Sequence, residues 1–264
     1  MQNKCCFIIF AHNNLHTNED VQDMIDNISY FHKNCDFYVN HPTLTHPKVK
    51  IKHRLGALNN SNFIFGALVE FINNLTIEEI NSFDHFCLVS ANQYFINTIN
   101  FEKDVNYLQY LNTENWDQTY NGKDSDKTIV GFPLQQNYGR WDMKDLYKAY
   151  NIEKPMSANW ECMTLTNKTM LLAKEHLNKC LEYYPNQDMI NIFLPYMAIL
   201  SGQEWEFPPY FGTYDPSNRP SFNHIISVEQ VNEKLQNGYF AVKRVNYKKD
   251  CPIKEYIRTN LMSK

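Results

Sequence analysis

The sequence predicts an α/β protein whose central sheet is mostly parallel and is covered by helices on both faces. Short apolar runs of strand length alternate along the chain with segments whose apolar residues recur at helical spacing. In the N-terminal part of the chain the order is strand, helix, strand, strand, helix, strand. This order is typical of a parallel sheet, because parallel strands need long crossover connections, which helices usually provide.

The N-terminal elements are predicted from short patterns. Residues 4–11 and 35–39 are apolar runs and are interpreted as buried strands. Residues 48–53 alternate apolar and basic side chains, which predicts a third, less buried strand. Between the first two strands, apolar residues at helical spacing over residues 21–28 predict a helix, and Asn18 is its expected cap.

The rest of the chain continues the alternation. A second helix is predicted at residues 63–75, and the apolar run within residues 83–95 predicts another buried strand. Residues 100–128 are polar and aromatic, and we interpret them as an insertion or a long loop. Short strands are expected at residues 129–134 and 239–242. Further helices are expected at residues 141–150, 167–183, 187–200 and about 227–237, with a short last helix at the C-terminus.

The composition fits one globular domain of 264 residues. With 43% hydrophobic and 14% aromatic residues the chain can bury a sizeable core, and no internal repeat or linker divides it. We therefore expect a single domain, residues 1–264, with residues 1–100 as its ligand-binding half and residues 101–264 as its catalytic half. The net charge of −4 argues against a nucleic-acid-binding protein, which would normally show a basic face.

The cysteines and the apolar runs favour a cytoplasmic protein. The seven cysteines include no Cys-x-x-Cys pair, and we expect reduced thiols rather than a disulfide framework. The apolar run at residues 5–11 is too short for a signal peptide, and no run approaches the roughly 18 apolar residues of a membrane span. Basic residues at 248–249 and near the C-terminus leave open a peripheral contact with a membrane surface.

Polar side chains follow three of the predicted strands, at the end where parallel sheets bind their ligands. None of these ends carries a Gly-x-Gly-x-x-Gly or a Walker loop, so neither a dinucleotide site nor a P-loop is expected. The end after residues 86–89 carries hydroxyl and amide groups without charge, and these are poor sole ligands for Mn²⁺ or Mg²⁺. We therefore expect a metal-free binding site. The candidate binding residues are His12, Asn13, Asn40, Ser90, Asn92 and Gln93.

Two other patterns bear on a metal. Asp124 and Asp126 form a single Asp-x-Asp pair, which offers two hard oxygen ligands, but the pair lies in a polar turn flanked by lysines. His41 and His46 lie in a segment broken by prolines, which does not favour a zinc site. We expect a solvated turn and no metal centre, and the Asp pair stays open as an alternative.

One carboxylate and two cations are the main candidates for chemistry. Pro185 breaks the preceding helix and Asn186 can cap the next one, which places Asp188 in its first turn. There Asp188 either stabilises the helix start or acts as a general base in a pocket. Lys243, near the last predicted strand, and Arg219 either bind a diphosphate without a metal or belong to a charged surface.

Several of these segments resemble, in order, motifs of the core-2/I-branching glycosyltransferase family, which also includes the peptide xylosyltransferases. Residues 83–95, FDHFCLVSANQYF, are similar nearly throughout to a family strand that reads Phe-Asp-Tyr-Phe-x-Leu-x-Ser-Gly-x-Asp-Tyr-Pro. The resemblance covers most of the chain in collinear order. The other similar segments are residues 7–14, 37–41, 62–75, 157–166, 186–188 and 240–243.

This resemblance implies a GT-A type, Rossmann-like fold and an inverting transfer of a sugar from a nucleotide sugar to a glycan or glycolipid hydroxyl. It implies that Asp188 is the general base and that Lys243 and Arg219 replace a metal at the diphosphate. Glu161 and Glu206 are the second choices for the base. The expected donor is a UDP-linked N-acetylhexosamine or pentose, as in polysaccharide biosynthesis, and no cofactor is expected besides this co-substrate.

The sequence departs from the family at three motif positions. Asp188 stands where the family has Glu, Gln93 where it has Asp, and Ala91 where it has Gly. These departures bear on the donor and the acceptor more than on the fold. Two alternatives stay open: a metal-dependent transferase that uses Asp124 and Asp126, and a non-catalytic carbohydrate-binding protein of the same fold.

Overall fold

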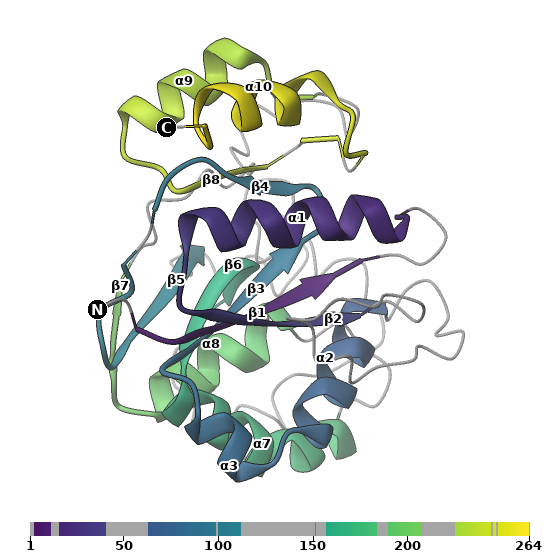
Figure 1. Cartoon of the computed structure of the whole chain (residues 1–264). Coiled ribbons are helices and arrows are strands. Elements are labelled where there is room, and N and C mark those ends of the chain that lie inside the picture. The colour runs from purple at the N-terminus through teal and green to yellow at the C-terminus, as the bar shows by residue number, and fades with distance from the viewer. Residues whose placement is uncertain are drawn as a thin grey trace, which may run out of the picture.

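The computed structural model shows a mixed six-stranded sheet between two layers of helices, with a smaller sheet and two further helices stacked on one side (Figure 1). The predicted segments at residues 48–53, 129–134 and 141–150 lie outside the residues that the structure describes. The described residues are 3–11, 16–40, 63–98, 100–111, 151, 157–183, 190–206, 225–243, 245–246 and 248–263.

The central sheet has the strand order β2-β1-β3-β6-β5-β7. β1 is parallel to both β2 and β3, and β5 is parallel to β7, whereas β6 is antiparallel to both of its neighbours. The prediction of a mostly parallel α/β sheet is therefore confirmed, with β6 as the reversed strand among those described. The strands are β1 (Cys5–Phe10), β2 (Cys35–Asn40), β3 (His85–Ser90), β5 (Val105–Leu111), β6 (Ser157–Thr166) and β7 (Glu204–Glu206).

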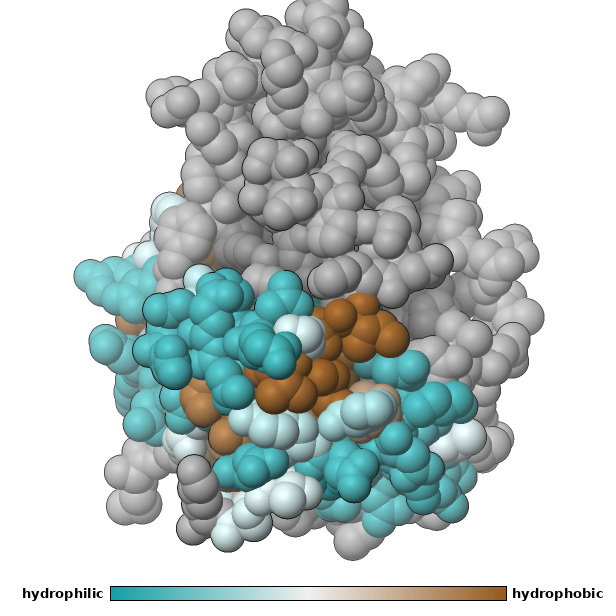
Figure 2. All heavy atoms as spheres, turned by 90° about the horizontal axis from the view of Figure 1, so that it is seen from above, coloured by the Kyte–Doolittle hydropathy of each residue, from teal (hydrophilic) through white to brown (hydrophobic). Residues whose placement is uncertain are grey.

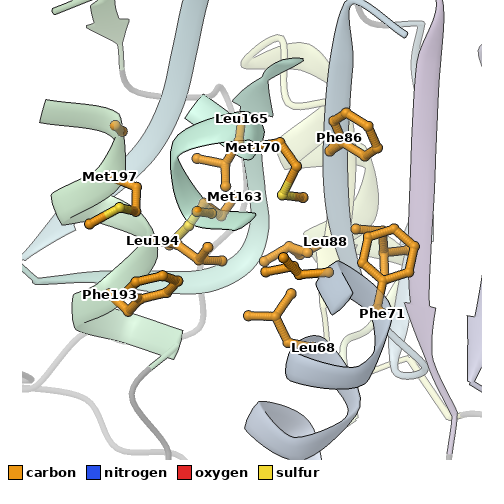
Figure 3. Close-up of a cluster of buried hydrophobic side chains, with 14 of the residues drawn as sticks. Leu68, Phe71, Phe86, Leu88, Met163, Leu165, Met170, Phe193, Leu194 and Met197 are labelled. Carbon is orange, nitrogen blue, oxygen red and sulfur yellow. The ribbon is translucent and has the colours of Figure 1, made fainter. Parts of the chain in front are cut away.

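One face of the sheet packs against four helices. The even-numbered residues of β1 point to this face, and Figure 3 shows how apolar side chains of the helices meet those of β3 and β6 there. Each large apolar side chain that is fully buried contributes roughly 1.5–3 kcal/mol. Because both faces of the sheet are covered, β1 is apolar throughout and does not alternate. The helices are α2 (Phe63–Asn74), α3 (Ile77–Asn81), α7 (Asn167–Tyr183) and α8 (Ile190–Leu200).

The opposite face is covered by α1 (Asn18–Phe31), which lies across the sheet in Figure 1. The odd-numbered residues of β1 pack against this helix. The hydroxyl of Thr17 accepts from the Asp20 N–H, and the Asp20 carboxylate accepts from the Thr17 N–H. The prediction that Asn18 caps the helix is wrong by one residue, because the Thr17–Asp20 capping box satisfies two backbone N–H groups at once.

A second sheet of two strands lies beside α1. β4 (Gln93–Phe95) pairs in antiparallel fashion with β8 (Ala241–Lys243). α9 (Val228–Gln236) and α10 (Pro252–Asn260) form an apolar cluster with this sheet that includes Tyr94. Seen from above, the described residues of this layer are mostly hydrophilic and surround a smaller apolar group (Figure 2). The strands and helices form a separate layer that shields one side of α1.

Charged groups connect the layer of β4, β8, α9 and α10, which we call the C-terminal layer, to α1. Arg258 Nη1 donates to Asp23 Oδ1 at 2.5 Å, and the Tyr94 hydroxyl donates to the same oxygen at 3.0 Å. The fully buried Lys254 ammonium forms an ion pair with Asp23 Oδ2 at 3.0 Å, without the angles of a hydrogen bond. A second contact involves Asp20 on α1, whose carboxylate accepts from the backbone N–H of Lys249. Burial raises the pKa of the Asp20 carboxyl, but the hydrogen bonds from the backbone N–H groups of Thr17 and Lys249 outweigh burial and lower this pKa to about 2.

Three strands of the central sheet were not expected from the sequence pattern. Residues 105–111, which we interpreted as part of a loop, form β5, residues 157–166 form β6, and residues 204–206 form β7. Polar side chains inside the sheet hide the apolar pattern of β5 and β6, and β7 consists of three exposed residues. Asn106 Oδ1 accepts from the Thr166 N–H at 3.0 Å and from the Thr169 hydroxyl at 2.9 Å. The oxygen of this buried amide is therefore paired within the protein, whereas its nitrogen Nδ2 has no hydrogen-bond partner among the described residues.

Replacing Asp23 should destabilise the protein strongly. Asp23→Ala removes the acid partner of the buried Lys254 ammonium, and we expect a loss of about 3–5 kcal/mol in the free energy of unfolding. Glu233→Ala is the control, because Glu233 pairs with Lys234 and its side chain is 60% exposed. That control should cost less than about 1 kcal/mol. Urea denaturation measures the loss in both variants, and losses of equal size would contradict the role of Asp23 as the partner of the buried Lys254.

Candidate active site

The carboxyl ends of three parallel strands meet at one edge of the sheet. Phe10 on β1 is in register with Asn40 on β2 and with Ser90 on β3. Ligands of open α/β sheets bind at this edge, so two of the predicted binding residues stand where a ligand is expected. His12 and Asn13 follow β1 in the sequence and lie outside the described residues.

The turn after β3 is closed by its own side chains. The backbone N–H of Ser90 donates to Gln93 Oε1 at 2.6 Å, and the Ser90 hydroxyl donates to Asn92 Oδ1 at 2.5 Å. The carbonyl of Asn92 also accepts the backbone N–H of Val245 at 3.1 Å. These bonds bring together the three polar residues that the sequence predicted here and hold them in one geometry.

The strand next to this turn, β6, is irregular. Tyr107 of β5 pairs with Thr164 of β6, but Gln109, two residues further on, pairs with Asn159, which is five residues away from Thr164. The register of β6 therefore shifts between Thr164 and Asn159. Within this stretch Cys162 has a φ of 57°, a left-handed value that is uncommon for residues other than glycine. Its Sγ accepts a hydrogen bond from Gln93 Nε2 at 3.1 Å. Bulges often re-aim side chains next to active sites, and the residue beside this one is Glu161.

β8 brings a cation to the same place. In the pairing of β4 with β8, Lys243 stands opposite Gln93. The Lys243 ammonium forms an ion pair with Glu161 Oε2. The side chain of Glu161 is 7% exposed and that of Lys243 is 17% exposed, so solvent screens this pair less than a surface pair. The site therefore combines uncharged polar groups with one shielded pair of opposite charges.

The thiol in the site is not set up as a nucleophile. Burial raises the pKa of the Cys162 thiol well above its ordinary value, and the hydrogen bond from Gln93 offsets this only in part. The protonated thiol is therefore the form present at neutral pH, and it reacts far less readily than a thiolate. Cys162 instead links the bulge of β6 to the turn after β3.

Glu206, the remaining candidate among the described residues, is not brought into this group. Glu206 is exposed on β7 and is in register with Tyr107 on β5. β5 therefore lies between Glu206 and β6, the strand that carries Glu161. The described residues contain no group of three or more His, Cys, Asp or Glu that could hold a metal ion. No helix in the described part of the chain is long and apolar enough to cross a membrane. Asp124, Asp126, Asp188 and Arg219 lie outside the described residues.

Sequence reasoning missed two features of the site. Glu161 and Lys243 were separate candidates, but their contact joins positions 82 residues apart and leaves no local signal. Cys162 was treated as an ordinary structural thiol. Its left-handed backbone could not be expected from the sequence, because glycine is the residue that usually marks such a position.

Comparisons with known proteins give weak likenesses of fold. No protein-family model and no curated protein matches the sequence. Core-mannan synthase A of Aspergillus fumigatus, in its Mn/GDP form, aligns over 88% of this chain and 82% of its own, with 7% identity and a TM-score of 0.40. The bifunctional glycosyltransferase WbbM aligns over 99% of this chain and 52% of its own, with 12% identity and a TM-score of 0.43. This chain thus spans about half of the length of WbbM.

The ion pair in the site should be energetically coupled. The free energies of unfolding of the wild type, Glu161→Gln, Lys243→Met and the double variant form a double-mutant cycle. The coupling energy from this cycle should be about 1.5 kcal/mol or more, because both side chains are shielded from water. The control cycle uses Lys4 and Asp36, which are 3.3 Å apart with side chains 38% and 33% exposed, and should give less than about 1 kcal/mol. A site coupling no larger than that of the control would contradict the assignment.

Proposed function

We propose that this protein is an inverting, metal-independent glycosyltransferase that moves a sugar from a nucleotide-sugar donor to a glycan hydroxyl. The observation that carries this proposal is the delivery of Lys243 to an uncharged polar turn at the carboxyl end of β3. Ligands of open α/β sheets bind at this end. Hydroxyl and amide groups such as those of Ser90 and Asn92 suit the hydroxyls of a sugar or ribose, and an ammonium suits a phosphate.

The donor in this proposal is a UDP-linked N-acetylhexosamine or pentose, as the resemblance to the core-2/I-branching family suggests. Its diphosphate contacts Lys243 and Arg219. Its ribose and sugar contact the polar residues at the strand ends, and the acceptor is a hydroxyl of a glycan or a glycolipid. The proposed donor-binding residues at the strand ends are His12, Asn13, Asn40, Ser90, Asn92 and Gln93.

The proposed reaction is a single displacement. The acceptor oxygen forms a bond to the anomeric carbon on the face opposite the diphosphate, and the bond from that carbon to the diphosphate oxygen breaks. Asp188 takes the proton of the acceptor hydroxyl as the general base. The electron pair of the broken bond goes to the diphosphate, whose added charge is stabilised by Lys243 and Arg219. The anomeric configuration is inverted, and no oxidant or reductant is needed.

Glu161 is the second candidate for the base, and its contact with Lys243 argues for a different role. One oxygen of its carboxylate is engaged by the ammonium. This contact must open before that oxygen can accept a proton from the acceptor. We therefore assign the base to Asp188 and treat Glu161 as the ionic partner of Lys243.

Substitutions of the proposed base and cation test the reaction. A thermal-shift panel of UDP-, GDP-, dTDP- and CMP-sugars first identifies the donor, and nucleotide release then reports transfer. Asp188→Asn should lower transfer at least about 100-fold while the donor Kd stays the same, since the amide cannot accept the proton. Lys243→Met should weaken donor binding as well as transfer. Lys103→Met, which changes an exposed lysine, should keep full activity. Unchanged turnover in Asp188→Asn would sink the assignment of the base.

Removal of divalent ions tests the metal-independent mechanism. Transfer should persist in EDTA at the same rate, because Lys243 and Arg219 supply the positive charge at the diphosphate. Loss of transfer in EDTA that Mn²⁺ or Mg²⁺ restores would point instead to a metal-dependent transferase using Asp124 and Asp126. If no nucleotide sugar is bound or turned over, a carbohydrate-binding protein of the same fold becomes the better explanation.

A further inference from the structure

We propose that Glu161 is a competing partner for Lys243: it holds the ammonium in the donor-free protein and gives it up to the diphosphate when the donor binds. The inference rests on the proposed function for the identity of the donor, and it adds an exchange of ionic partners to the binding step. It is carried by the direct contact between the two side chains at the carboxyl end of β3.

Lys243 needs a counter-charge at this position. Its side chain is 17% exposed and that of Glu161 is 7% exposed. A charge shielded from water is unfavourable unless a group of opposite charge lies next to it. Glu161 provides that charge from the irregular stretch of β6, which the hydrogen bond between Cys162 and Gln93 holds against the turn.

The exchange needs movement of a side chain but not of the backbone. Lys243 is itself part of the β4–β8 pairing, opposite Gln93, so its Cα is fixed. Its ammonium ends a flexible four-carbon stem and can turn from one acceptor to another. A diphosphate offers several charged oxygens, whereas Glu161 offers one carboxylate, so the diphosphate is the stronger partner once it is present.

Competition of this kind changes binding in a direction that a structural role does not. An anion that binds Lys243 must displace Glu161, so the ion pair lowers the apparent affinity of the empty site for a diphosphate. Glu161→Gln keeps the shape and removes the charge, and it should therefore raise that affinity. If Glu161 only supported the fold around Lys243, the same substitution would leave the affinity unchanged or lower it.

Inorganic pyrophosphate is the probe, because it carries a diphosphate without nucleotide or sugar. Isothermal titration calorimetry should give a Kd about tenfold lower for Glu161→Gln than for the wild type, and at least about tenfold higher for Lys243→Met. The double variant should bind no more tightly than Lys243→Met alone. Glu233→Gln, which removes one exposed negative charge elsewhere, should match the wild type. The gain in Glu161→Gln must therefore depend on Lys243.

Three outcomes would overturn the exchange. They are an unchanged or weaker affinity in Glu161→Gln, an equal gain when Lys243 is already replaced, and no measurable pyrophosphate binding in either the wild type or Glu161→Gln. If Glu161→Gln does not fold, Glu161→Asp replaces it, because it draws the charge about one methylene away from Lys243 and should also tighten binding. Nucleotide release from nucleotide sugars is measured separately, so its absence would refute the proposed function while the pyrophosphate titration still decides the exchange.

Discussion

The antiparallel pairing of β4 with β8 is the interaction on which the site depends. β4 follows β3 of the central sheet after a short turn, whereas β8 comes from the C-terminal part of the chain. Three residue pairs join the two strands, and one of them sets Lys243 opposite Gln93. Without this pairing the turn after β3 would offer hydroxyl and amide groups alone. With it, the same edge of the sheet gains a fixed positive charge.

The C-terminal layer keeps this position through directional contacts as well as apolar packing. Asp23 on α1 binds Lys254 and Arg258 from α10. The same carboxylate accepts a hydrogen bond from Tyr94, which lies on β4 itself. Hydrogen bonds and ion pairs of this kind fix orientation, which a purely apolar contact would leave adjustable. The network thus reaches from the outer helix to the strand that holds Lys243 in register.

Apolar periodicity predicted most of the fold, because it reports burial directly: the helix expected at residues 167–183 has the same bounds as α7. β5 and β6 were not predicted because polar residues such as Asn106, whose Oδ1 accepts hydrogen bonds inside the sheet, interrupt the apolar pattern. The turn after β3 was predicted as a binding site, and Glu161 and Lys243 were each named as candidates. Their contact could not be foreseen, because it depends on strand pairing between distant segments and on the left-handed backbone of Cys162.

The central claim is that Lys243 binds the diphosphate of a sugar donor at the carboxyl end of β3. A crystal structure of the protein with the donor's nucleoside diphosphate tests it most directly. We expect Lys243 Nζ at about 2.7–2.9 Å from a diphosphate oxygen and no longer in contact with Glu161. A diphosphate bound through a divalent ion on Asp124 and Asp126, with Lys243 still paired to Glu161, would contradict the claim.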